Sequence, residues 1–309
     1  MSTYLDQFRH FVIASGWSAR AGKPVPYGEQ LIVSDGTHEA MLNFYPKRGK
    51  MLVGGPSSLL RTRIEAWVAT QAGPIASPTT GSAPRTRPEA QIGADESGKG
   101  DWFGPPVVAA VYLDADQATA LQRAGVRDSK ELERDGITQL ARLIEGAIPT
   151  PQRFVNALAP EDYNRRYAEY ANINLLLAQL YAETVGPVWR ATQAATIVCD
   201  QFSQRADRLA KAFSMAGLPE PQQRHHAEST SVAVAAASIL ASAHFAAELA
   251  LLGRAAGLRG PLPGGASDVR ALERAARSIV QQAGSAGLAR YAKLNFKPVR
   301  ALLGLPDGG

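Results

Sequence analysis

The chain has 309 residues, of which 45% are hydrophobic and 20% are charged, and this composition excludes wholesale disorder because it supplies enough apolar residues for a core. The single cysteine, Cys199, excludes an intrachain disulfide and a zinc site built on several thiolates, and it favours a reducing, cytoplasmic location. No basic segment followed by a long apolar run opens the sequence, so we expect no signal peptide.

Residues 1–70 predict a small α+β domain. Apolar residues at helical spacing predict a helix over 3–14, and β-rich runs predict three strands at 30–33, 41–45 and 50–53. An amphipathic helix over 58–70 completes the domain. Residues 71–88 are rich in Pro, Gly, Ser and Thr and lack an apolar period, which is typical of a flexible linker.

Positive charge is concentrated at this end of the chain, whose net charge is +5. Residues 1–88 contain ten Lys and Arg against five Asp and Glu, whereas residues 89–309 contain 23 basic and 23 acidic residues. Lys47, Arg48 and Lys50 are clustered around one turn. This asymmetry predicts a first domain that binds a polyanion and a second, neutral domain that carries out the chemistry.

Residues 89–309 predict an α/β domain with a largely helical second half. Strands are expected at 92–96, 107–113, 153–158 and 195–200, and helices at 129–144, 161–192, 203–216, 229–252 and 267–282. The apolar stretch 232–250 is rich in Ala and is interrupted by Ser238, Ser242, His244 and Glu248. It therefore predicts a buried helix and not a membrane span.

Two adjacent acids, Asp95 and Glu96, end the first strand of this domain and run into the turn Gly98-Lys99-Gly100. Neighbouring strand residues point to opposite faces, so both acids serve one site only if the strand ends there and the backbone bends, which the glycines permit. The turn also offers backbone N–H groups and the Lys99 ammonium to a phosphate or a sugar. The alternative interpretation is a solvated acidic turn.

Two further acids lie where α/β domains carry functional groups. Asp200 ends a buried strand and Glu228 lies at a helix start, although each, taken alone, is more typical of a capping or loop acid. The pair His225-His226 is interpreted as exposed loop residues, and Cys199 as a small apolar filler. Together the four acids form an all-carboxylate set: Asp95, Glu96, Asp200 and Glu228. Carboxylate oxygens suit Mg²⁺ or Mn²⁺, and two such ions can promote the hydrolysis of a phosphodiester bond.

Several motifs, in order along the chain, resemble those of type 2 ribonucleases H and most closely the ribonuclease HIII branch. They are residues 93–105 with 107–110, the element Asp128-Ser129-Lys130, Ala227-Glu228-Ser229 ahead of its apolar helix, and residues 293–297. In the first domain, residues 43–45 and 49–53 resemble the TATA-box-binding-protein-like domain of ribonuclease HIII. The likeness covers both domains, with departures at Gly264, where the family leads us to expect Lys, and at Ser97 and Lys99, which differ from the commonest turn residues but leave both glycines in place.

The resemblance implies a TATA-box-binding-protein-like substrate-binding domain at 1–70 and a ribonuclease H-like catalytic domain at 89–309. It implies a metal-dependent endonuclease that hydrolyses the RNA strand of RNA/DNA hybrids by a two-metal mechanism, with Mg²⁺ or Mn²⁺, leaving 3′-OH and 5′-phosphate ends. The four acids carry over as its catalytic and metal-binding residues. The substrate-binding residues are then Gly98, Lys99, Gly100, Asp128, Ser129 and Lys130, to which we add the basic cluster Lys47, Arg48 and Lys50.

Two alternatives remain open. Within the enzyme class, the alternative is ribonuclease HII-like excision of single ribonucleotides embedded in DNA, against which the context of Glu228 and the first domain argue. From another class, the alternative is a hybrid-binding protein without catalysis, against which the four acids argue. We expect a monomer whose partner is the RNA/DNA hybrid duplex, with no membrane and no obligate protein partner.

Overall fold

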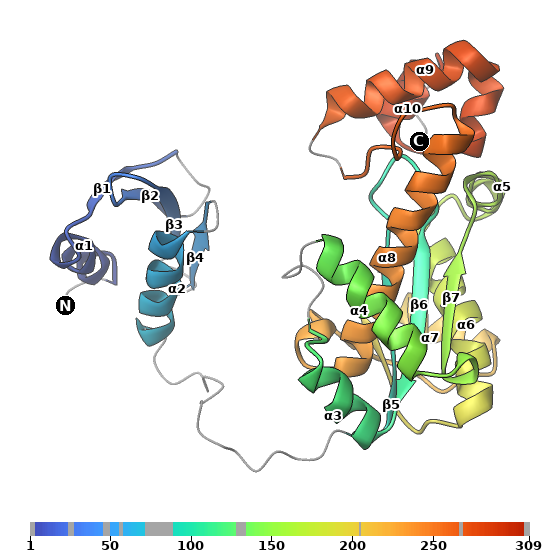
Figure 1. The fold of residues 1–309 in the computed structure, drawn as a ribbon, viewed down its shortest axis with the longest axis horizontal. Helices are drawn as coiled ribbons and strands as arrows, with labels where there is room; N and C mark the ends of the chain where they lie inside the picture. The colour runs from blue at the N-terminus through green and yellow to red at the C-terminus, as the bar shows by residue number, and fades with distance from the viewer. Residues whose placement is uncertain are drawn as a thin grey trace. The chain divides into compact units, whose positions relative to one another are not determined.

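The structure is a computed structural model that describes residues 4–23, 28–45, 50–55, 58–71, 89–127, 134–203, 205–265 and 268–305. The chain divides into two compact units, Met1–Arg85 and Thr86–Gly309 (Figure 1). This boundary falls inside the predicted linker. Residue 71 of that linker closes the last helix of the first unit, and residues 72–88 lie outside the described part of the chain.

The first unit is a four-stranded antiparallel sheet with two helices. Its elements are α1 (Tyr4–Ala14), β1 (Ser18–Ala21), β2 (Glu29–Ser34), β3 (Glu39–Tyr45), β4 (Lys50–Gly54) and α2 (Leu59–Gln71), with strand order β1-β2-β3-β4. The prediction of three strands is wrong, because every side chain of β1 is exposed and this strand has no apolar alternation. Alternate residues of β2 and β3, among them Leu31, Val33 and Leu42, pack with Phe8 and Ile64 of the helices in one core.

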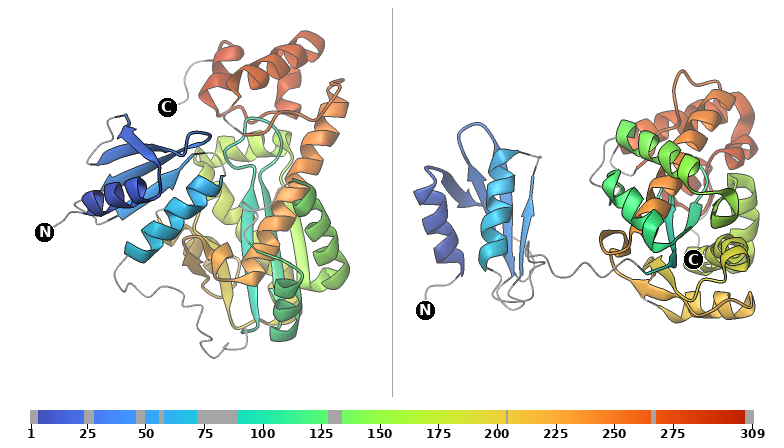
Figure 2. Two further views of the ribbon diagram at one scale, coloured as in Figure 1. Left: turned by 60° about the vertical axis from the view of Figure 1, so that its left-hand side comes forward. Right: turned by 60° about the horizontal axis from the view of Figure 1, so that its bottom comes forward.

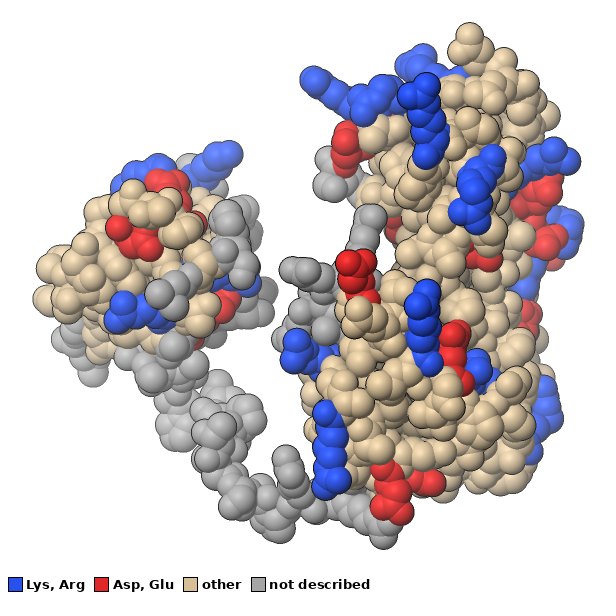
Figure 3. All heavy atoms as spheres, viewed as in Figure 1, with Lys and Arg blue, Asp and Glu red and all other residues tan. Residues whose placement is uncertain are grey.

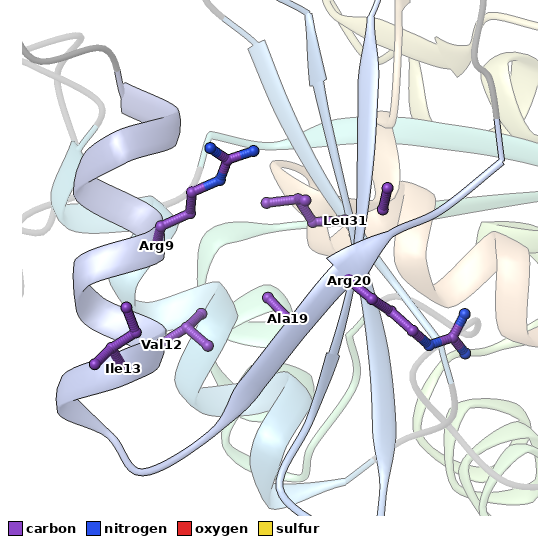
Figure 4. A pocket seen from close by; sticks show the side chains of 7 residues that line it. Arg9, Val12, Ile13, Ala19, Arg20 and Leu31 are labelled. Atoms are coloured by element: carbon purple, nitrogen blue, oxygen red, sulfur yellow. The ribbon is translucent and has the colours of Figure 1, made fainter.

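A cleft of about 290 Å³ lies between α1 and the first two strands of this unit (Figure 4). The residues that line it include the apolar Val12 and Leu31 and the basic Arg9 and Arg20, and the Arg20 guanidinium points away from α1 (Figure 4). Arg20 also forms an ion pair with Glu39, at 3.1 Å. The residues that line this cleft thus include two basic ones and no acidic one.

The second unit contains a five-stranded mixed sheet. Its strands are β5 (Gln91–Ser97), β6 (Val107–Leu113), β7 (Arg153–Ala157), β8 (Ile197–Asp200) and β9 (Gln222–Arg224), in the order β7-β6-β5-β8-β9. Strand β5 pairs antiparallel with β6 and parallel with β8. Four of these strands are predicted from apolar runs, but β9 is not, because its three residues are all polar.

The helices of this unit follow the predicted order, with differences in their number and bounds. They are α3 (Ala115–Arg123), α4 (Arg134–Ala147), α5 (Pro160–Tyr170), α6 (Ile173–Thr192), α7 (Asp207–Met215), α8 (Val232–Ala255), α9 (Val269–Gly287) and α10 (Lys297–Leu302). Helices α3 and α10 are additional, and the predicted start of the helix 129–144, residues 129–133, lies outside the described residues. The region 161–192 is two helices, because Ala171 adopts a left-handed conformation (φ 50°) and the Asn172 side chain caps α6.

The sheet is covered on both faces (Figure 2). On one face, α8 packs with Val107, Ala109 and Val111 of β6 in a core that also includes residues of α3, α4 and α9. On the other face, α6 packs with Ala94 of β5 and with Val108 and Ala110 of β6. Helix α8 is long and apolar enough to cross a membrane by length and composition, but it lies in the core, as predicted.

Strand β5 and helix α8 approach each other unusually closely at Gly93. A Cβ atom on this glycine would lie 2.2 Å from the carbonyl carbon of Ala233 and 2.2 Å from the backbone nitrogen of Val234. Only glycine therefore allows the two backbones to touch. The contact fixes α8 against the strand that carries Asp95 two residues later.

Candidate active site

The carboxyl ends of β5 and β8 form one edge of a cavity of about 330 Å³. These strands are parallel neighbours, with Ala94 opposite Cys199, so the acids that follow them come to the same end of the sheet. The cavity is lined by residues of β5, the turn after it, the end of β8 and helix α8: Asp95, Glu96, Ser97, Gly98, Lys99, Asp200, Ser238 and Ser242. Three of the four predicted acids thus share one cavity.

Asp95 and Glu96 reach this cavity from opposite faces of the sheet. Asp95 lies opposite Ala109, on the α8 face, and accepts a hydrogen bond from the Ser238 side chain. Glu96 lies opposite Val108, on the α6 face, and its Oε2 accepts a hydrogen bond from the Tyr181 hydroxyl. The predicted end of the strand is one residue too early, because β5 continues to Ser97 and both acids lie within its last three residues.

The electrostatics of these two acids reflect their confinement. Burial raises the pKa of Asp95 well above its usual value, and the nearby charges of Glu96 and Asp200 raise it further. Burial also raises the pKa of Glu96 to about 7, against the opposing effects of the Tyr181 hydrogen bond and the Lys99 charge. A divalent cation bound in this cavity would offset the repulsion between the ionised carboxylates.

Asp200 and Glu228 are connected through the backbone. Asp200 Oδ1 accepts a hydrogen bond of 2.9 Å from the N–H of Ala227, which holds the 3₁₀ turn η4 (Ala227–Ser229) beside the end of β8. Glu228 lies in this turn and not in α8, whose N-cap is Ser231. Its side chain is only 1% exposed, lies 3.7 Å from the exposed His226 and does not line the cavity.

The donor atoms of these acids are of the type that a divalent cation prefers, but the side chains do not form a ready-made binding site. In the described ranges, no three His, Cys, Asp or Glu side chains converge closely enough to hold an ion as they stand. The donor set nevertheless consists of carboxylate oxygens, the ligands that Mg²⁺ and Mn²⁺ prefer. Cys199 is buried beside the acids and burial raises the pKa of its thiol, so it is the inert filler that the sequence predicts.

The two glycines of the turn after β5 differ in what the fold demands of them. Gly98 has a φ of +80°, and a Cβ there would lie 2.6 Å from both the Phe245 ring and the carbonyl oxygen of Pro105. Gly98 is therefore required by the fold itself. Gly100 is exposed, and no atom lies within 4 Å of the position of its Cβ, so the room beside it is open to a substrate.

Lys99 is held against the segment that follows Asp200. Its Nζ donates a hydrogen bond of 2.7 Å to the carbonyl oxygen of Phe202 and lies 5.1 Å from the centre of the Phe202 ring. Desolvation lowers the pKa of this half-buried ammonium. The lysine thus joins the turn to the end of β8, which is a structural role that the sequence does not predict.

The remaining predicted residues are not brought into this site by the described part of the chain. Asp128, Ser129 and Lys130 lie outside the described residues, as do Lys47 and Arg48. Lys50 begins β4 in the first unit.

Three side chains of the site were not predicted from the sequence. Ser238 and Ser242 are polar interruptions four residues apart on an Ala-rich helix, and no local signal marks Tyr181.

The residues of the C-terminal motif anchor the loop beyond the turn. Lys293 is fully buried, and its Nζ donates a hydrogen bond of 2.7 Å to the carbonyl oxygen of Gly104. The backbone nitrogen of Lys293 donates to the carbonyl oxygen of Trp102 at 2.8 Å. This motif therefore supports the β5–β6 loop from behind and does not enter the cavity.

A mixed sheet of this order, with carboxylates at the shared end of its central parallel strands, fits the ribonuclease H-like fold class, and comparison with known proteins identifies the family. The model of the family described as Ribonuclease HII matches residues 92–299. The chain is 37% identical over 213 residues to the Ribonuclease HIII of Protochlamydia amoebophila, covering 69% of this chain and 68% of that protein. It is 34% identical over 211 residues to the Ribonuclease HIII of Bacillus cereus, covering 66% of this chain and 65% of that protein.

Among solved structures, the "Crystal structure of Bst-RNase HIII in complex with Mn2+" matches with a TM-score of 0.65 at 28% identity and covers 96% of both chains. The chain belongs to the type 2 ribonuclease H family, in which its curated relatives are ribonucleases HIII. It is a ribonuclease H, an endonuclease that acts on RNA/DNA hybrids. The predicted fold class and enzyme class are confirmed.

Proposed function

We propose that Asp95, Glu96, Asp200 and Glu228 hold the Mg²⁺ or Mn²⁺ ions with which this chain hydrolyses the RNA strand, leaving 3′-OH and 5′-phosphate ends. The observation that carries the proposal is the convergence of three of these carboxylates on one cavity, where burial and mutual repulsion raise the pKa of the first two. Carboxylates confined in this way have a high free energy when ionised, and a divalent cation lowers it. The Mn²⁺ complex of a similar protein supports the choice of ion.

When bound, the ions supply the positive charge that activates water and stabilises the leaving oxygen. The chain's own residues set where that charge is placed. Ser238 orients Asp95, Tyr181 orients Glu96, and the N–H of Ala227 orients Asp200. Glu228 follows Ala227 directly, and this placement beside Asp200 supports its assignment as the fourth ligand.

The turn after β5 is proposed to contact the substrate backbone. Gly100 is exposed and has open space beside it, which permits the close approach of a ribose. A ribose 2′-hydroxyl is what distinguishes RNA from DNA at one nucleotide, so contact here would select the RNA strand. We keep Asp128, Ser129 and Lys130 as proposed substrate contacts, on the family resemblance alone.

The first unit is proposed to bind the hybrid duplex. Residues 1–88 carry the net charge of +5, and Arg9 and Arg20 line its cleft (Figure 4). We also propose, from their clustering in the sequence, that three basic residues of this unit contact the hybrid: Lys47, Arg48 and Lys50.

The second unit has balanced charge, but helix α9 carries three exposed arginines, Arg270, Arg274 and Arg277. Figure 3 shows several basic side chains at this end of the unit. Basic side chains on both units supply phosphate contacts without sequence preference, as a hybrid-specific nuclease requires. We propose a cytoplasmic monomer with no obligate protein partner and no membrane association.

The decisive experiment compares Asp95→Asn with Asp162→Asn in cleavage of a long RNA/DNA hybrid. Asp162 is an exposed acid on α5 that pairs with Arg165 at 2.7 Å, so it controls for the same chemical change outside the cavity. We expect Asp95→Asn to abolish cleavage while hybrid binding persists, because the variant loses a ligand and also loses repulsion toward phosphate. Cleavage by Asp95→Asn within a fewfold of wild type would refute the assignment.

The same assay with a duplex that contains one embedded ribonucleotide separates the two enzyme alternatives. Preference for the long hybrid supports the proposed function, whereas preference for the single ribonucleotide identifies ribonuclease HII-like excision. Binding without cleavage by the wild-type chain, in the presence of Mg²⁺ or Mn²⁺, identifies a non-catalytic hybrid-binding protein.

A further inference from the structure

Tyr181 lies behind the active-site acids in the middle of α6. Its side chain is fully buried in the core on that face of the sheet, and its hydroxyl is the hydrogen-bond donor to Oε2 of Glu96. We propose that Tyr181 is a positioning residue for Glu96: it holds one carboxylate oxygen and so determines that the other serves the ion. This inference rests on the proposed function, which makes Glu96 a metal ligand.

The ring of Tyr181 is itself fixed by the two segments that carry the acids. It stacks on Phe202 with ring centres 5.0 Å apart and an interplanar angle of 27°. Phe202 follows Asp200 by two residues, and Lys99 of the β5 turn binds both its carbonyl oxygen and its ring. The hydroxyl is therefore held in place by contacts from the ends of both β5 and β8, so its hydrogen bond fixes Glu96 relative to Asp200.

A buried tyrosine hydroxyl needs a partner in any protein, so the hydrogen bond by itself is not evidence of a functional role. Tyr163 shows the ordinary arrangement in the same core: it is equally buried, and its hydroxyl donates to the amide oxygen of Asn295 at 3.0 Å. The partner of Tyr181 differs because it is an acid that lines the cavity. Hydrogen bonds to an ionised partner are about twice as strong as neutral ones, which makes this contact capable of orienting the carboxylate.

Asp95 is held in a parallel manner on the other face of the sheet. Ser238 of α8 donates to Asp95 from one side, and Tyr181 of α6 donates to Glu96 from the other. Each of the two neighbouring acids thus has one hydroxyl donor from a helix on its own face. Such outer partners of a metal ligand typically contribute about 10–100-fold to metal affinity or activity.

The test compares Tyr181→Phe with Tyr163→Phe, which removes the same hydroxyl from the same core away from the acids. Mn²⁺ binding is measured by calorimetric titration of substrate-free protein, and kcat and KM are measured on a long hybrid. We expect Tyr181→Phe to weaken Mn²⁺ binding about tenfold or more and to lower kcat with KM unchanged. Tyr163→Phe is expected to leave Mn²⁺ affinity and kcat within about twofold of wild type, since Asn295 does not line the cavity.

The outcomes separate this inference from the proposed function. Mn²⁺ affinity and kcat of Tyr181→Phe within about twofold of wild type overturn the positioning role, and so do equal losses in both tyrosine variants, which indicate loosened packing. Glu96→Gln is the reference: wild-type Mn²⁺ affinity in that variant removes Glu96 from the ligand set and overturns the proposed function as well.

A second variant keeps the inference testable where Tyr181→Phe does not fold. Phe202→Leu keeps the hydroxyl group of Tyr181 but removes the ring on which Tyr181 stacks, so the hydroxyl is less firmly positioned. It is expected to weaken Mn²⁺ binding in the same direction by a smaller factor. An unchanged Mn²⁺ affinity in a folded Phe202→Leu protein overturns the inference.

Discussion

Replacing Gly93 by alanine tests how closely the sheet and helix α8 depend on each other. The added Cβ would lie 2.2 Å from two backbone atoms of α8, at Ala233 and Val234, whereas ordinary carbon contacts lie at about 3.5–4.0 Å. No side chain can move aside to relieve this overlap, so the strand and the helix must separate by roughly 1–2 Å.

The size of the effect follows from that displacement. Overpacking a core costs about 1–3 kcal/mol, and a backbone clash at two atoms belongs at the upper end of this range or beyond it. For a unit of this size, a loss of about 3 kcal/mol lowers the midpoint of thermal unfolding by roughly 6–12 °C. The shift also moves Ser238 away from Asp95, so we expect kcat to fall along with stability.

Differential scanning calorimetry of the full chain measures the effect on the second unit. The matched control is Gly136→Ala in α4, where no atom lies within 4 Å of the added Cβ, and where alanine is expected to stabilise the helix by up to about 1 kcal/mol. The same chemical change thus has opposite expected signs at two glycines of one unit. A Gly93→Ala protein that melts within about 1 °C of wild type shows that β5 and α8 are not in backbone contact, and the reasoning fails.

Three further expectations concern the turn, pH and the first unit. Gly100→Ala should melt like wild type and lose cleavage, whereas Gly98→Ala should unfold at lower temperature; normal turnover by a folded Gly100→Ala protein would separate the turn from the substrate. In metal-free protein, burial raises the pKa of Glu96 to about 7, above the 4.5 of an unperturbed glutamate, so the free energy of unfolding should fall as pH rises through this interval. Glu96→Gln should flatten that fall in urea titrations at several pH values. A fragment that starts at Glu89 should bind hybrid about tenfold or more weakly and show a salt dependence that is less steep by roughly 0.9 per lost phosphate contact; equal affinities and slopes would exclude a binding role for residues 1–88.

The parts of the fold that the sequence predicts are those with an apolar period. Strand β6 and helix α8 are largely apolar runs, and β5 carries the buried residues Ile92 and Ala94 before its acids; the structure places all three in the centre of the second unit. Strands β1 and β9 carry no such pattern, because one is fully exposed and the other has three polar residues. The break between α5 and α6 falls at Ala171, where neither Gly nor Pro marks it.

In the candidate site, too, some residues could be predicted from local sequence patterns and others could not. Asp95, Glu96 and Asp200 are predictable because each lies within the last three residues of a strand, and the ends of neighbouring parallel strands meet at one edge of the sheet. The role of Tyr181 depends on contacts between segments 85 residues apart in sequence, and that of Lys99 on contacts between segments 103 residues apart. The placement of Glu228 depends on a backbone hydrogen bond to Asp200, which no residue pattern encodes.

The opposite orientation of Asp95 and Glu96 has a consequence for how sequences of this kind diverge. One acid is anchored to the layer of α8 and the other to the layer of α6, so the distance between the two carboxylates depends on the thickness of the sheet and on the volume of both cores. A methyl group gained or lost deep in one layer moves one acid and leaves the other in place, since close-packed interiors transmit such strain. Selection for turnover therefore acts on interior residues that never meet the substrate, and substitutions in the two layers are expected to compensate each other across the sheet.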